Sequence, residues 1–241
     1  MEYRGQMPKL HTNAFGRRAV LLSMLVAGSL ALPGCTTMGM PRTGAGGQAD
    51  AVDRLLMLAS QRAFAKLTQP DGFWDSTVAR INLPVLFARP GSGAEKLLKS
   101  NLFRESLQHK LNNFAEGGAR AAAPLVYQSV RALKVTDGSA VLRGGNTAAT
   151  TLLRTTMASS LVNAMIPELT RLMQEEKDPV VSSAVAALKG VTITDAAHAL
   201  ALDADNAIWY EIGAEEAAIR KDPASTNDPA LTAALQAVPA S

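Results

Sequence analysis

Apolar residues recur at spacings of three and four along most of the chain after residue 48, a pattern typical of amphipathic helices. In residues 50–67, the apolar positions that share one helix face are Val52, Leu55, Leu56, Ala59 and Ala63. Runs of β-branched residues with period two, which would indicate strands, are nearly absent. The pattern therefore predicts an all-α fold, a single helical-bundle domain of about seven helices.

Glycine, proline and N-cap signals divide this domain into separate helices. The expected helices cover residues 50–67, 94–116 with an interruption near 100–101, a short segment after residue 136, 147–176, 180–188, 195–221 and 229–238. We expect Thr136, Asn146 and Thr194 to be N-caps, because their side chains accept hydrogen bonds from the first turn. Pro124 is expected to kink or restart its helix, and Pro167 is expected to kink the 147–176 helix.

The first 34 residues have a different pattern. A polar and basic stretch up to Arg18 precedes Ala19–Leu32, which is a run of 14 residues without a charge. A transmembrane helix needs about 20 apolar residues, and a basic stretch before a shorter apolar run is typical of a signal peptide. The run ends in Leu32-Pro33-Gly34-Cys35, which resembles a bacterial lipobox, where the leader is cut before a lipidated cysteine. We expect residues 1–34 to be a lipoprotein signal peptide and Cys35 to carry the lipid.

Some features of this leader leave alternatives open. Cys35 would otherwise be an incidental cysteine after a signal peptide, or a buried one. Arg17 and Arg18 resemble a twin-arginine export signal, and the alternative is an ordinary basic region before the apolar run. Met7 is as good a start as Met1. A threonine rather than an aspartate follows the cysteine, which favours the outer membrane, facing the periplasm, as the location of the anchor.

Composition and charge indicate how residues 35–238 are organised and argue against one class of partner. Residues 35–48 are rich in Gly, Thr and Pro and are expected to form a flexible tether after the lipidated cysteine. Residues 49–238 are expected to form the folded domain. The chain has 24 basic and 21 acidic residues, but the leader holds four basic residues and one acidic residue, so the rest is neutral. A neutral body without a basic stripe argues against nucleic-acid binding.

The titratable residues do not form a recognised catalytic or metal-binding motif. One Cys and three His argue against a disulfide scaffold and against a structural zinc site. The sequence contains no G-x-S-x-G, H-E-x-x-H or P-loop motif. His109 and His198 lie on separate predicted helices and have no ligand partner three or four residues away. We therefore expect no metal and no cofactor.

Four residues are candidates for a buried polar or ligand-binding site. Glu215 falls within an apolar stripe of the 195–221 helix, where a carboxylate is costly to bury unless it is paired. We expect it to pair with an arginine or to line a cavity, unless Gly213 shifts the register and leaves it solvated. Glu116 lies in a Gly/Ala-rich segment that permits close helix packing. Thr151 and Thr155 belong to a hydroxyl-rich face that would line a pocket, unless the hydroxyls bond to carbonyls one turn earlier.

Two further predictions concern an ion pair on the last long helix and an irregular segment after the first helix. Glu216 precedes Arg220 by four residues, which is the favourable order for an ion pair on a helix surface. Residues 71–84 lack helical periodicity, and we expect an irregular or short-stranded segment there. Phe73 and Trp74 at its start are either an exposed contact loop or, more commonly, a pair packed inward.

Several segments together resemble a known family. They are Asp71-Gly72-Phe73, Ile81-Asn82-Leu83-Pro84, Asn112-Asn113-Phe114-Ala115-Glu116, the stretch from Val135 to Thr150, and Glu215-Glu216 with Ile219-Arg220-Lys221-Asp222-Pro223. In order and spacing they resemble the bacterial family called domain of unknown function 4197, over about residues 50–237. The resemblance implies an exported, mostly helical protein, in many members a lipoprotein, and implies no catalytic residues.

These observations favour a non-enzymatic, membrane-anchored lipoprotein with an envelope-associated binding or structural role. Its expected partners are the membrane, through the lipid anchor, and a protein or an apolar ligand. The first alternative is a periplasmic lipid- or small-molecule-binding protein. The second, ranked below it, is a carboxylate-dependent hydrolase in which Glu215 or Glu116 acts as acid or base.

Overall fold

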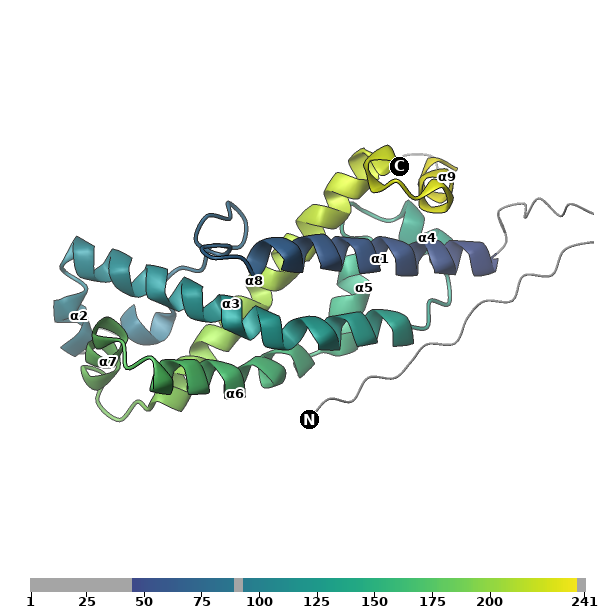
Figure 1. Cartoon of the computed structure of the whole chain (residues 1–241). Helices are drawn as coiled ribbons and strands as arrows, with labels where there is room; N and C mark the ends of the chain where they lie inside the picture. The colour runs from purple at the N-terminus through teal and green to yellow at the C-terminus, as the bar shows by residue number, and fades with distance from the viewer. Residues whose placement is uncertain (1–44, 89–92, 238–241) are drawn as a thin grey trace, which may run out of the picture. The chain divides into compact units, whose positions relative to one another are not determined.

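The computed structural model describes residues 45–88 and 93–237, and every regular element in those ranges is a helix (Figure 1). The expected all-α fold is confirmed. The elements are α1 (Ala45–Leu67), η1 (Val85–Ala88), α2 (Gly93–Leu97), α3 (Asn101–Ala132), α4 (Gly138–Arg143), α5 (Ala148–Met157), α6 (Ser160–Glu175), α7 (Pro179–Ala186), α8 (Ile193–Lys221), η2 (Pro223–Thr226) and α9 (Pro229–Gln236). The signal peptide, Cys35 and most of the tether lie outside the described residues.

The long helices α1, α3, α6 and α8 pack around one apolar core. α1 and α3 lie side by side and run in opposite directions, α6 packs along α3, and α8 packs against α1, α3 and α6 (Figure 1). α5 lies between α8 and the shorter helix α4. The largest fully buried side chains are Phe73, Phe87, Leu55, Leu56, Leu67, Leu107, Leu111, Leu153, Leu161, Met165, Leu169 and Leu200.

Two glycines let α3 and α6 approach closely. A Cβ atom on Gly117 would lie 2.3 Å from Cδ1 of Leu172, and one on Gly118 would lie 3.1 Å from Cδ2 of Leu169. A side chain at either position would displace these leucines. The close approach expected of the Gly/Ala-rich segment is therefore confirmed.

Helix starts differ from the expected ones. α1 begins at Ala45, so residues 45–48, which composition assigns to the tether, form its first turn. Thr192, not Thr194, caps α8: it accepts from the Asp195 amide at 3.1 Å, and Asp195 accepts from the Thr192 amide at 2.8 Å. This capping box provides two of the bonds that the helix start would otherwise lack. Asp137, not Thr136, caps α4 through the Ala140 amide at 2.8 Å.

The expected 147–176 helix is two helices. The chain breaks at Ala158, whose φ of 47° is unfavourable for a residue with a Cβ atom, and α6 then continues through Pro167. α3 likewise continues through Pro124 and does not restart there. The break follows a run of hydroxyl side chains, which compete for backbone hydrogen bonds and weaken a helix. It needs no proline or glycine, which is why the sequence pattern did not indicate it.

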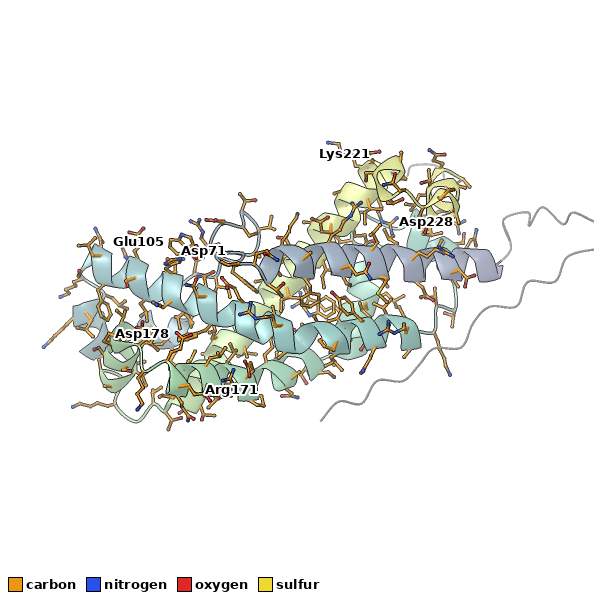
Figure 2. All side chains as sticks on the ribbon, viewed as in Figure 1. Asp71, Glu105, Arg171, Asp178, Lys221 and Asp228 are labelled. Carbon is orange, nitrogen blue, oxygen red and sulfur yellow. The ribbon has the colours of Figure 1, made fainter. Side chains whose placement is uncertain are left out.

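The C-terminal helix α9 packs on α1 through the buried side chain of Leu231 and through an ion pair made by Asp228. Asp228 caps α9 by accepting from the amides of Ala230 and Leu231 at 3.0 and 3.1 Å. Its other carboxylate oxygen pairs with Nη1 of Arg54 on α1 at 2.9 Å, and Figure 2 shows Asp228 beside α1. Since the pair is partly exposed, its contribution to stability is small, and the burial of Leu231 is the larger contact between α9 and the core.

Candidate functional site

The irregular segment after α1 is held against α3 by a buried asparagine. The Asn112 side chain accepts from the Ile81 amide at 2.9 Å and donates to the Ile81 carbonyl at 2.9 Å, so it pairs with the backbone as a neighbouring strand would. It also donates to the Gln108 carbonyl at 2.8 Å. Asn112 is fully buried. These bonds fix the segment in one position, although it has no strand or helix of its own.

The tight turn at the start of this segment also depends on α3. Asp71 has a φ of 59°, and a Cβ atom on Gly72 would lie 2.3 Å from the Lys66 carbonyl, so the turn requires glycine there. Nε2 of His109 lies 2.7 Å from Oδ1 of Asp71, which Figure 2 labels beside α3. The Trp74 ring packs on His109 with centroids 4.8 Å apart. His109 therefore has a structural role.

Glu116 on α3 forms hydrogen bonds to the backbone of the same turn. It is 6% exposed, and the backbone amides of Asp71 and Gly72 bond to its carboxylate. Burial raises the pKa of Glu116 above its ordinary value, and these bonds and the nearby Arg120 oppose that shift. Its Oε1 atom has no hydrogen-bond partner among the described residues. Glu116 is thus a buried polar group, as expected, and it holds a loop.

Glu215 belongs to a group of four side chains that we call the Lys66 cluster: Lys66, Ser76, Glu211 and Glu215. Nζ of Lys66 lies 3.2 Å from Oε1 of Glu211 and also bonds to Glu215. Ser76 donates to Oε2 of Glu211 at 3.0 Å. The carboxylate side chains are 5% and 8% exposed, whereas that of Lys66 is 59% exposed. The hydrogen bond to Glu215 is the main reason that the pKa of Lys66 is raised.

The cluster decides between the alternatives for Glu215. It is buried and paired rather than solvated, and its partner is a lysine of α1 rather than an arginine. The sequence analysis did not identify Glu211, Lys66 or Ser76. A signal was present, because Glu211 and Glu215 are four residues apart on one helix, and such like charges repel unless a cation lies between them.

Glu216 forms the most buried ion pair in the described ranges, which corrects the expected surface pair with Arg220. Its carboxylate is fully buried and accepts from Nε and Nη2 of Arg220 at 2.9 and 2.8 Å. It also accepts from the amides of Ala149 and Thr150 at 3.0 and 2.7 Å and from the Thr150 hydroxyl at 2.6 Å. Glu216 therefore caps α5 from another helix. Thr147 holds the N-cap position instead of the expected Asn146, and its side chain makes no capping bond to any described residue.

Arg220 extends this contact to α4. Its guanidinium donates to the carbonyls of Leu142 and Val141 at 2.8 and 3.1 Å, and these carbonyls belong to the last turn of α4. One ion pair thus supplies an anion to the start of α5 and a cation to the end of α4, as the helix dipoles favour. Two of the segments that carry the family resemblance meet here.

A cavity of about 580 Å³ lies between α5 and α8, and we call it the α5–α8 groove. Residues lining it include Thr151, Thr155, Trp209, Tyr210, Gly213 and Ala214. The structure thus brings Thr151 and Thr155 together at a groove, but both are exposed rather than buried. Their hydroxyls donate to the carbonyls of Thr147 and Thr151, each at 2.8 Å.

The α5–α8 groove is therefore mostly apolar in character. The two threonine hydroxyl hydrogens are used within α5, and the Trp209 indole donates to Asp205 at 2.9 Å. Arg154 also lines the groove, and its guanidinium donates to Asn206 at 2.5 Å and pairs with Asp205 at 3.5 Å, so each of these groups already has a partner within the protein. Gly213 and Ala214 add little volume, which leaves the space open. A volume of this size is typical of small-molecule sites, whose walls are mostly apolar.

A second cavity, of about 450 Å³, adjoins the groove, since Val78 and Ala214 line both. We call it the acidic cavity. Its other lining residues include Lys66, Asp75, Ser76 and Glu211. Of the candidates from the sequence, neither Glu116 nor Glu215 is among the described residues that line the groove or the acidic cavity.

The described part of the chain places no three His, Cys, Asp or Glu side chains where they could hold a metal ion together. Within the same ranges, no helix has both the length and the apolar character needed to cross a membrane.

These features define an all-helical domain with internally paired buried carboxylates and an apolar groove between two of its helices. A family model described as "Protein of unknown function (DUF4197)" matches residues 44–235. The chain belongs to this family, as the resemblance of its segments indicated. No curated protein and no solved structure matches the chain.

Proposed function

We propose that this chain is an exported bacterial lipoprotein, anchored through Cys35 and facing the periplasm from the outer membrane, whose helical domain binds an apolar ligand without catalysing a reaction. The sequence Leu32-Pro33-Gly34-Cys35 supports the anchor. The α5–α8 groove supports the binding role, and it is the observation on which that role depends. Several acyl chains would hold the protein stably at the membrane.

The arrangement of the carboxylates favours binding over catalysis. An acid–base mechanism needs two titratable groups that converge on a substrate. Glu116 on α3 holds the Asp71–Gly72 turn, and Glu215 on α8 is paired with Lys66. A hydrolase in which Glu116 or Glu215 acts as acid or base is therefore the weaker alternative.

The anchor can be tested by intact mass analysis of the protein isolated from bacterial envelopes. The proposal predicts a mature chain that begins at Cys35 and carries fatty acyl chains. The Cys35→Ala variant should accumulate as the uncleaved precursor. A mature chain that begins elsewhere, or that lacks acyl chains, would refute the anchor.

The binding role of the groove can be tested by calorimetry, with decan-1-ol titrated into the full chain carrying Cys35→Ser. Ala214→Phe adds a ring at a half-buried position that lines the groove and should weaken binding by about tenfold or more. Ala218→Phe is the matched control, because Ala218 is an exposed α8 residue that does not line the groove. Equal effects of the two substitutions would exclude the groove as the binding site.

A further inference from the structure

We infer that the groove binds a cationic amphiphile, a molecule with a primary ammonium group on an aliphatic chain, with the chain in the α5–α8 groove and the ammonium in the acidic cavity. This inference rests on the proposed binding function and specifies the chemistry of the ligand. It follows from the position of the two cavities, from their different lining and from their charge.

The apolar part of the ligand would contact exposed hydrophobic side chains. Val78 and Tyr210 are 47% and 61% exposed, and both line the α5–α8 groove. Apolar side chains that line a concave site can be covered by the apolar part of a ligand. Bound methylene groups would cover them, and each buried methylene contributes about 0.8 kcal/mol.

The acidic cavity selects the charge of the head group. Asp75 and Glu211 line it, and Glu215 lies next to it in the Lys66 cluster. Among the residues that line the cavity, two carboxylates stand against the ammonium of Lys66, which gives a formal excess of one negative charge, and Lys66 is itself paired with the adjacent Glu215. The chain after the leader is neutral as a whole, so this excess is local. A concave site with an excess of one charge sign attracts the opposite charge.

Lys66 does not reverse this preference. Its ammonium already pairs with both Glu211 and Glu215, so an anionic head group would compete with two carboxylates for one cation. A primary ammonium instead brings three donors. Acceptors are available at the Asp75 carboxylate and at Glu211, whose carboxylate has more acceptor positions than its two observed partners use.

The two cavities are placed to hold the two ends of one small molecule. They share Val78 and Ala214, so the acidic cavity adjoins the groove. Their volumes, about 580 and 450 Å³, lie within the range of small-molecule sites. These observations favour a single small ligand over a docked protein.

The test compares three probes with the same alkyl chain, decylamine, decan-1-ol and decanoate, by calorimetry at neutral pH on the full chain carrying Cys35→Ser. We expect decylamine to bind about tenfold more tightly than decan-1-ol, with a preference that decreases as salt is raised, and decanoate to bind most weakly. Glu211→Gln keeps an acceptor for Ser76 and should bring the affinity for decylamine down to that for decan-1-ol measured on the same variant. Glu105→Gln removes one charge at an exposed position of α3 and should leave the preference intact.

Each other outcome has a defined meaning. If decylamine and decan-1-ol bind equally well, or decanoate binds best, the inference is wrong while the apolar groove stands as proposed. If none of the three binds, both the inference and the binding role of the groove are wrong. If Glu105→Gln lowers the preference as much as Glu211→Gln does, the selectivity arises from overall charge and not from the acidic cavity.

Discussion

Replacing Glu216 with glutamine should lower the free energy of unfolding by about 3 kcal/mol. The carboxylate is fully buried and accepts from two amides of α5, from the Thr150 hydroxyl and from Arg220. Glutamine keeps one acceptor oxygen but brings an amide group that faces these donors. The charge on Arg220, whose side chain is 10% exposed, would then lack its anion.

The size of the effect follows from what remains after the substitution. Breaking a buried ion pair by removing one partner costs about 3–5 kcal/mol. Arg220 still donates to the carbonyls of Leu142 and Val141, which places Glu216→Gln at the lower end of that range. For a domain of this size, 3 kcal/mol corresponds to a decrease in Tm of about 6–12 °C.

Urea denaturation followed by circular dichroism measures this loss. Glu176→Gln is the matched control, because Glu176 is exposed at the end of α6, and it should change stability by less than about 0.5 kcal/mol. A double-mutant cycle with Arg220→Met should give a coupling energy of about 1–3 kcal/mol. A loss below about 1 kcal/mol for Glu216→Gln, or no coupling, would refute the structural role assigned to this pair.

Three further substitutions test other parts of the structure. Ala158→Gly should raise stability by about 1 kcal/mol in the same assay, because glycine adopts the positive φ of the α5–α6 break without strain, and a loss of stability would contradict this. Asn112→Ala should cost about 2–4 kcal/mol and speed hydrogen exchange of the Ile81 amide, and unchanged exchange would show that Asn112 does not hold the segment. Glu116 has a raised pKa, so the folded state holds its proton more tightly than the unfolded chain, and stability should fall as pH rises from the ordinary glutamate pKa towards the folded one. Glu116→Gln should remove that part of the pH dependence. If the wild-type chain and Glu116→Gln show the same change in unfolding free energy from about pH 4 to pH 7, this assignment is wrong.

Helical periodicity was enough to predict the fold because each long helix buries one continuous face. The apolar stripe on α8 that includes Leu200, Ala204, Ile208, Ile212 and Ile219 is fully buried, as its spacing predicted. Helix ends were less predictable, since they depend on which of several neighbouring polar residues has the geometry to cap. Thr192 and Asp137 were preferred over Thr194 and Thr136 for this reason.

The polar contacts could be predicted only in part. Spacing showed that Glu215 needs a partner, but it could not identify Lys66, which is 149 positions away in sequence. The i,i+4 rule pointed to the pairing of Glu216 with Arg220 but not to its burial, which depends on the start of α5 packing over α8. For the α5–α8 groove, the hydroxyl-rich face with Thr151 and Thr155 indicated one wall, but the wall from α8 could not be predicted, because it comes from a separate segment.

Amide chemical-shift mapping by NMR tests the central claim most directly, with decylamine titrated into the full chain carrying Cys35→Ser. The proposals predict saturable shifts at Thr151, Thr155 and Gly213 on the groove walls and at Ser76 in the acidic cavity, with α9 unchanged. Shifts that never saturate, or that concentrate on α9 or other surfaces away from the groove, would contradict the claim that this domain is a binding protein for an aliphatic cation.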